Sequence, residues 1–174
     1  ELVLMEIAPR IAGTMGIERA KGVNLPLLSL FDAMNYEVSV FENNYNIEID
    51  RALENKYKHD IQYDHAYIDF DDLVIFEGKV SPVVIGFVYQ CINNGIKTHL
   101  LTRHRENLDD TLKKHHLTGV FDELIWIKDD TPKSSYITES GSIFIDDSFA
   151  EREEVHKTLG IPVFDAHMIE ALLR

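Results

Sequence analysis

The stretch AYIDFDDLVIF (66–76) decides how the chain is interpreted, because an apolar run leads directly into three carboxylates and then becomes apolar again. Asp is a poor strand former, and neighbouring like charges repel. Asp69, Asp71 and Asp72 are therefore unexpected at the end of a strand. They either lie in an exposed turn or belong to a site that requires negative charge, and the remaining sequence has to distinguish these possibilities.

Short apolar runs alternate with helical patterns from residue 66 onward, which is typical of a parallel sheet with crossover helices. Strands are predicted at residues 65–70, 96–102, 123–127, 142–147 and 161–166. Helices are predicted at residues 81–93, 105–117, 133–138, 149–159 and 167–173. The sequence therefore predicts an α/β fold with a doubly wound, Rossmann-like parallel sheet.

The first 60 residues predict a small α+β segment of a different kind. Its predicted elements are a strand at the start of the chain, a helix at 25–34, and strands at 37–42 and 46–50. Asn43 and Asn44 would join the last two strands, and a polar stretch at 54–60 follows. Because so short a segment buries little surface by itself, we expect it to pack against another part of the protein. We place the two domains at 1–60 and 61–174.

The composition disfavours several classes of partner. The chain has 174 residues, of which 45% are hydrophobic, so it can bury a core. Its 30 acidic and 17 basic residues give a formal net charge of -13, which argues against nucleic acid and anionic membranes. The single cysteine, Cys91, excludes an internal disulfide. No apolar run approaches the roughly 20 residues that span a bilayer, so we expect a cytoplasmic globular protein.

Polar side chains gather at one predicted edge of the sheet. Most lie at the ends of the predicted strands 65–70, 96–102 and 142–147, and one opens the helix before the last of these. They are Asp69, Asp71, Thr102, Lys133, Asp146 and Asp147. In a doubly wound sheet, ligands bind beyond the carboxyl ends of the strands. Clustered carboxylates are tolerated there when a hard cation such as Mg²⁺ holds them, and an added ammonium and hydroxyl suit phosphoryl oxygens. The sequence therefore predicts a site for Mg²⁺ and a phosphorylated small molecule.

These residues resemble the haloacid dehalogenase-like (HAD) superfamily, whose members are mostly Mg²⁺-dependent phosphohydrolases. The resemblance covers about residues 65 to 170. It is carried by YIDFDD (67–72), HLLT (99–102), Lys133 and IFIDD (143–147), in that order. Each motif is weak alone, whereas four in the family's order are fairly specific. Because few residues separate the first two motifs, the resemblance implies a minimal-cap member with an open site.

The resemblance implies a role for each matching residue. Asp69 would be the nucleophile that forms an aspartyl-phosphate, and Asp71 would protonate the leaving oxygen and later activate water. Thr102 and Lys133 would bind the transferring phosphoryl group. The Mg²⁺ ligands would come from Asp69, Asp71, Asp146 and Asp147, with Asp71 contributing its backbone carbonyl. Arg103 and Ser148, beside these motifs, are further candidates for substrate binding.

Four features near the motifs are interpreted as structural. Leu73 stands where the family usually has Thr or Val, at a position that supports the turn, and Asp72 is interpreted as a turn residue. His104, just after Thr102, could touch substrate, but it is interpreted as a bystander. The run EREE (151–154) is interpreted as the solvent face of a helix.

The start of the chain has a resemblance of its own. MEIAPRIAGTMG (5–16) is similar to the last core strand of an ATP-grasp ligase of the carbamoyl-phosphate synthetase large-chain-like kind. Glu6 matches that family's metal ligand and Arg10 its phosphate-side Arg, but Ala8 replaces the expected Asn. Residues 1–60 would then be the C-terminal remnant of an ATP-grasp domain. The chain begins inside a predicted strand, so we expect the rest of the parent ATP-grasp polypeptide as its partner.

Two other functions remain open at this point. The chain could be the C-terminal fragment of an ATP-grasp ligase, with the HAD-like domain as an accessory. It could also be a non-catalytic, receiver-like phosphoacceptor, since that fold also combines acids, Thr and Lys in a doubly wound sheet. The motif order disfavours the receiver, because here Lys133 precedes the final acidic pair.

Overall fold

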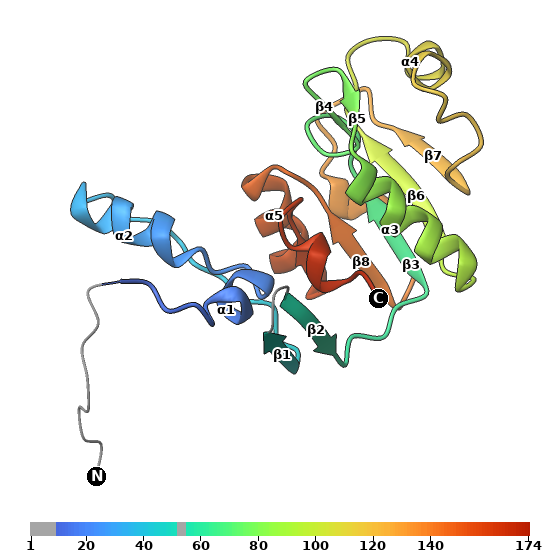
Figure 1. Ribbon diagram of the computed structural model, residues 1–174. Helices are drawn as coiled ribbons and strands as arrows, with labels where there is room; N and C mark the ends of the chain where they lie inside the picture. The colour runs from blue at the N-terminus through green and yellow to red at the C-terminus, as the bar shows by residue number, and fades with distance from the viewer. Residues whose placement is uncertain (1–9, 52–54) are drawn as a thin grey trace.

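The computed structural model describes residues 10–51 and 55–174. Its centre is a five-stranded parallel sheet, and all five predicted strands are confirmed, although the last is short (Figure 1). The strands are β3 (His65–Ile68), β6 (Lys97–Thr102), β7 (Glu123–Trp126), β8 (Ser142–Ile145) and β9 (Val163–Phe164). They lie in the order β7-β6-β3-β8-β9. The protein therefore has the predicted Rossmann-like α/β architecture.

The strand order places a topological switch point between β3 and β8. From β3 the chain adds β6 and β7 on one side, and β8 and β9 then follow on the other. Open α/β sheets bind ligands at such a point, beyond the carboxyl ends of the strands. Numbered along the chain, the five strands have the order 3-2-1-4-5. A receiver-type sheet has the order 2-1-3-4-5, so the fold argues against the receiver interpretation.

Helices cover both faces of the sheet. On one face lie α3 (Pro82–Asn93), α4 (Leu108–Lys114) and the short 3₁₀ helix η2 (Ile169–Ala171). On the other lie the 3₁₀ helix η1 (Lys133–Tyr136) and α5 (Phe149–Leu159). The predicted helices at 133–138 and 167–173 are thus only single 3₁₀ turns. Side chains of Ser81, Asn107 and Ser148 cap the three α-helices, which explains where each begins.

The core consists of two apolar layers separated by the sheet. Alternate residues of the central strands enter each layer, so that Ile68 and Ile145 pack under α3 while Tyr67 and Phe144 face α5. Because both faces of these strands are buried, their sequences are continuous apolar runs. Between β3 and α3 the chain forms a small hairpin of β4 (Ile75–Phe76) and β5 (Lys79–Val80). The hairpin agrees with the predicted minimal cap.

The N-terminal segment differs from its prediction. It contains α1 (Gly16–Ala20), α2 (Leu25–Ala33), and an antiparallel pair of β1 (Ile47–Arg51) and β2 (Asn55–His59). The predicted strand at 46–50 and the helix at 25–34 are confirmed. The strand predicted at 37–42 is wrong, since those residues have no ladder partner among the described residues. Strand β1 pairs instead with β2, which lies in the polar stretch at 54–60, where no strand was predicted. The predicted strand at the start of the chain lies almost entirely in residues 1–9, outside the described residues.

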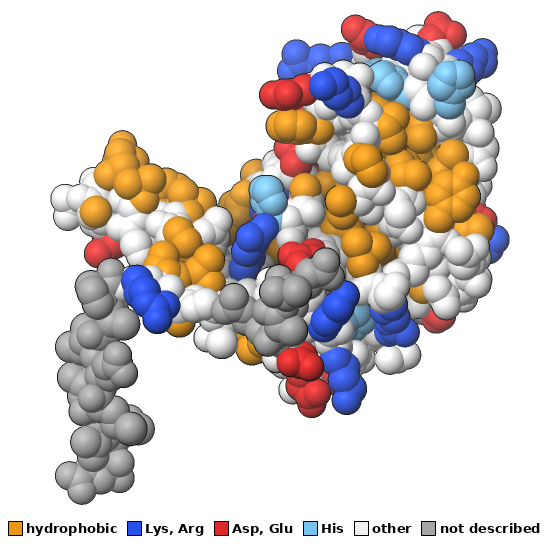
Figure 2. All heavy atoms as spheres, viewed as in Figure 1, with side chains coloured by type: hydrophobic (Ala, Val, Ile, Leu, Met, Phe, Trp, Pro, Cys, Tyr) orange, Lys and Arg blue, Asp and Glu red, His pale blue; other side chains and the backbone are white. Residues whose placement is uncertain are grey.

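Helix α2 and the segment after it expose many apolar side chains. Those exposed are Leu25, Leu27, Leu30, Met34, Tyr36, Val38 and Val40. The segment projects from the sheet in Figure 1, and Figure 2 shows hydrophobic side chains gathered over it. Among the described residues, no helix is long and apolar enough to cross a membrane.

Asn43 ties the N-terminal segment to the sheet. Its side chain is buried, where it donates to the carbonyl of Val163 and accepts a hydrogen bond of 3.0 Å from the Val163 N–H. Strand β9 lies at the edge of the sheet, and none of the described strands pairs with its outward backbone groups. The carboxamide of Asn43 takes the place of the missing strand. Tyr45 adds a second attachment, packing its ring near Phe164.

We expect Asn43→Ala to lower the free energy of unfolding by about 2–3 kcal/mol, because it leaves both backbone groups of Val163 unpaired in a buried place. The midpoint of urea denaturation would measure the loss. Asn44→Ala is the matched control, since Asn44 is exposed. Equal stability of the two variants would contradict this role for Asn43.

Candidate active site

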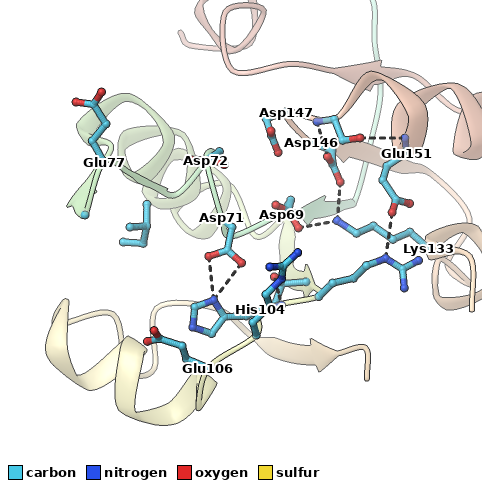
Figure 3. Close-up of a pocket in the computed structure, with 16 residues that line it drawn as sticks. Asp69, Asp71, Asp72, Glu77, His104, Glu106, Lys133, Asp146, Asp147 and Glu151 are labelled. Atoms are coloured by element: carbon cyan, nitrogen blue, oxygen red, sulfur yellow. Dashed lines mark hydrogen bonds and ion pairs between the residues drawn. The ribbon is translucent and has the colours of Figure 1, made fainter. Parts of the chain in front are cut away.

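Three buried charged groups meet at the switch point. Asp69 follows β3, Asp146 follows β8, and Lys133 opens η1 just before β8. The Lys133 ammonium Nζ lies 2.6 Å from Asp69 Oδ1 and 2.6 Å from Asp146 Oδ2 (Figure 3). Asp69 is 6% exposed, Asp146 is 1% exposed and Lys133 is 3% exposed. The structure therefore brings together residues from three of the four predicted motifs.

Burial dominates the protonation of this cluster. It raises the pKa of Asp69 to about 7, because desolvation outweighs the lowering by the Lys133 ammonium and Asp146 adds its negative charge. Burial likewise raises the pKa of Asp146 against the opposing effect of Lys133. For Lys133 itself, burial alone would lower the pKa, but the two carboxylates outweigh it and raise the pKa. Two carboxylates around one ammonium leave an excess negative charge that a proton or a cation would relieve.

Asp147 extends this group into a possible metal site. Asp69, Asp146 and Asp147 each offer a carboxylate oxygen, and these atoms lie within 4.8 Å of one another. Asp147 is exposed whereas the other two are buried, so an ion here would keep access to solvent. Oxygen ligands, excess negative charge and room for waters fit a hard cation such as Mg²⁺. The carboxylate of Asp71 is not a member of this cluster.

Thr102 and Asp71 lie beside the cluster. Thr102 is fully buried at the end of β6, and its Oγ1 accepts a hydrogen bond of 3.1 Å from the His104 N–H, which leaves its own hydroxyl proton free to donate. Asp71 points toward His104, whose Nδ1 lies 2.9 and 3.0 Å from the two carboxylate oxygens (Figure 3). Sequence reasoning missed this contact, because 33 positions separate the two residues and no local pattern joins them.

The two residues next to the motifs have structural contacts. Arg103 lines the pocket, but its guanidinium donates to Glu151 Oε1 at 3.0 Å and to the carbonyls of Asp129 and Thr131 at 2.6 and 2.8 Å. It therefore fixes the loop that leads into Lys133. Ser148 caps α5, and its N–H donates to Asp146 Oδ1 at 2.8 Å. Binding of substrate by either residue stays a prediction.

The interpretation of EREE (151–154) as a solvent face is wrong in part. Arg152 is buried and donates to the carbonyls of Asp146 and Asp147 at 2.6 and 2.7 Å. Glu154 accepts a hydrogen bond of 2.6 Å from the hydroxyl of Ser134, next to Lys133. Helix α5 thus supports the acidic loop and η1 at once. The charged run by itself does not indicate this role, because the hydrogen-bond partners of Arg152 and Glu154 belong to other parts of the chain.

An open pocket of about 680 Å³ lies over these groups. It is lined by the cluster, by Thr102 and His104, and by the β4–β5 hairpin. Asp72 has a positive φ of 56° and is exposed, which confirms that it is a turn residue. Leu73 is buried in the core and does not line the pocket. The Leu at this position, where the HAD pattern has Thr or Val, therefore lies in the core beneath the turn and leaves the wall of the pocket unaltered.

The proposed ATP-grasp residues cannot be placed in the same way. Glu6 and Ala8 lie outside the described residues, and Arg10 is exposed. Nothing in the described part of the chain or in the comparisons below supports the ATP-grasp resemblance, which stays a prediction.

Comparisons with known proteins reach only the level of fold. No protein-family model and no curated protein matches the chain. One similar solved structure is an uncharacterized protein from Corynebacterium glutamicum, with a TM-score of 0.47 and 12% identity over 57% of this chain and 82% of the other. Another is the N-terminal part of a Bacteroides fragilis protein containing a phosphatase domain, complexed with Mg, with a TM-score of 0.45 and 15% identity. That match covers 64% of this chain but only 39% of the other, and such values carry no argument about activity.

Asp69→Asn should change how stability depends on pH. Because the pKa of Asp69 is raised in the folded protein, its contribution is fully present below about pH 4 and is lost as the pH rises through about 7. In metal-free buffer, we expect the free energy of unfolding of the wild type to fall over this range by at most about 1.4 kcal/mol per pH unit. The Asn variant should lack that component and be the more stable protein at pH 8.

Urea titrations at a series of pH values would measure this difference. Asp72→Asn is the matched control, because it removes a carboxylate from the exposed turn three residues away. Parallel stability curves for wild type and Asp69→Asn would contradict the raised pKa.

Asp147→Asn should weaken Mg²⁺ binding by at least about tenfold, which corresponds to about 1.4 kcal/mol, because it removes one of three clustered carboxylates. Isothermal titration calorimetry with MgCl₂ would measure the dissociation constants. Glu106→Gln also removes a carboxylate from the pocket wall but lies outside the cluster, so it should leave binding nearly unchanged. Equal weakening in both variants would indicate general attraction of cations and no defined site.

Proposed function

We propose that the protein is a Mg²⁺-dependent phosphohydrolase that forms an aspartyl-phosphate on Asp69. The observation that carries the proposal is the contact of Lys133 with both Asp69 and Asp146 beneath an open pocket at the switch point. The contact supports the proposal because it holds a carboxylate next to a cation, and phosphoryl transfer through a covalent intermediate needs a nucleophile and a positive charge close together. The order of the motifs agrees with the HAD resemblance.

In the first step, a carboxylate oxygen of Asp69 attacks phosphorus. An O–P bond to Asp69 forms while the bond to the leaving oxygen breaks, and that oxygen takes a proton from Asp71. The Lys133 ammonium and the Thr102 hydroxyl hold the non-bridging oxygens, where negative charge develops. Arg103 and Arg152 do not touch the phosphoryl group, but they fix the two loops that supply Lys133 and Asp146.

In the second step, water attacks the aspartyl-phosphate. Asp71, now ionised, accepts a proton from this water, and the bond between phosphorus and Asp69 breaks to release inorganic phosphate. The carboxylate of Asp69 and the protonated Asp71 are thereby restored. A cation bound by Asp69, Asp146 and Asp147 would supply charge neutralisation, which keeps Asp69 ionised at neutral pH despite its burial.

The openness of the site bears on the substrate. The β4–β5 hairpin is the only element inserted between β3 and α3, and all of that region is described. A phosphate ester or acyl phosphate can therefore approach without the opening of a cap domain. We leave the identity of the leaving group open.

The wild type should hydrolyse p-nitrophenyl phosphate in the presence of Mg²⁺, and Asp69→Asn should lower kcat by at least about 10³-fold, since the amide is a poor nucleophile. Release of p-nitrophenol and of inorganic phosphate would measure the rate. Addition of EDTA should abolish it.

Asp72→Asn is the control for charge near the site and should retain nearly full activity. Asp69→Asn with wild-type activity would exclude the covalent mechanism. Accumulation of a stable phospho-aspartate without release of phosphate would favour a phosphoacceptor over a hydrolase.

A further inference from the structure

His104, interpreted from the sequence as a bystander, is held from several directions. Its N–H donates to Thr102 Oγ1 at 3.1 Å, and its carbonyl accepts a hydrogen bond of 2.8 Å from the indole of Trp126. The imidazole meets the ring of Phe70 edge-on, with 5.3 Å between centroids. The side chain is 10% exposed. Its position is therefore fixed by the protein independently of any ligand.

The hydrogen bonds also fix which nitrogen faces Asp71. The Thr111 hydroxyl donates to the Asn107 carbonyl at 3.0 Å, so its oxygen is free to accept from His104 Nε2 at 2.9 Å. The other nitrogen, Nδ1, then faces the Asp71 carboxylate at 2.9 and 3.0 Å. A continuous chain runs from the backbone of α4 through Thr111 and His104 to Asp71.

Asp71 has little else to hold it. Its side chain is 50% exposed, and His104 is the only hydrogen-bond partner of its carboxylate among the described residues. A carboxylate so exposed would otherwise sample several rotamers. Transfer of a proton to a leaving group requires one defined position, and a displacement of about 1 Å can cost about 10²-fold in rate. The contact with His104 selects the rotamer that faces the pocket beside Asp69.

We propose that His104 is a positioning residue that holds Asp71 where it can protonate the leaving oxygen, and that Thr111 holds His104 in turn. This inference rests on the proposed function. The effect acts through Asp71 and not on the phosphoryl group itself. It should therefore be large for substrates that need a proton on the leaving group and small for those that do not.

The test compares glycerol phosphate, whose alkoxide is a poor leaving group, with p-nitrophenyl phosphate, whose phenolate leaves readily. His104→Ala should lower kcat for glycerol phosphate by about 10- to 100-fold and kcat for p-nitrophenyl phosphate by less than about threefold. His104→Asn should restore most of the loss, because its amide occupies the place of Nδ1. His104→Gln should not, because its amide occupies the place of Nε2. Thr111→Val, which keeps the shape of the side chain, should lower kcat in the same selective way by a smaller factor.

A double-mutant cycle separates positioning from direct contact with substrate. Asp71→Asn combined with His104→Ala should be no slower than Asp71→Asn alone, because the two residues act as one unit. His167→Ala is the control, since His167 is exposed and distant in sequence from these motifs. Additive losses in the cycle, or equal losses for both substrates in His104→Ala, would overturn the inference and leave the proposed function standing. Absence of Mg²⁺-dependent turnover of both esters by the wild type would overturn both.

Discussion

The contact of the Lys133 ammonium with Asp69 and Asp146 is the interaction on which the site depends. Two carboxylates at the ends of adjacent strands would repel each other strongly once buried, and the ammonium between them offsets part of that cost. One ammonium cannot balance two carboxylates. Burial, together with the negative charge of Asp146, raises the pKa of Asp69 and makes the cluster a natural place for a cation or a proton. The imbalance of charge that destabilises the cluster without a cation is also what would attract Mg²⁺.

Much of the surrounding structure keeps this contact in place. Arg152 donates to the carbonyls of Asp146 and Asp147, and Arg103 joins α5 to the loop before Lys133. Glu154 accepts from Ser134 within η1. Helix α5 therefore acts as a support for two of the four motifs, through charged side chains that point inward. The proposed phosphohydrolase would need such rigidity, since a pre-placed cation stabilises developing charge only if it does not move.

The N-terminal segment is joined to the sheet by a few specific contacts. Asn43 completes the edge of β9, and Tyr45 enters the core near Phe164, as the thin core of this segment led us to expect. Helix α2 differs, since none of its residues is buried and several large apolar side chains are exposed. The segment therefore combines an attached part, within residues 41–51 and 55–63, with an apolar helix that the described chain does not cover.

The sequence by itself determined the sheet and the list of acids, because buried parallel strands are continuous apolar runs and their carboxyl ends share one edge. It therefore predicted Asp69, Thr102, Lys133 and Asp146 as neighbours. Only the tertiary structure decided the partners of Asp71, Arg103 and Arg152, since these contacts join residues far apart in the chain through side chains whose direction no local pattern specifies. The tertiary structure also decided the strand pairing of the N-terminal segment. There β1 pairs through backbone hydrogen bonds with β2, a polar strand that no apolar pattern in the sequence indicates.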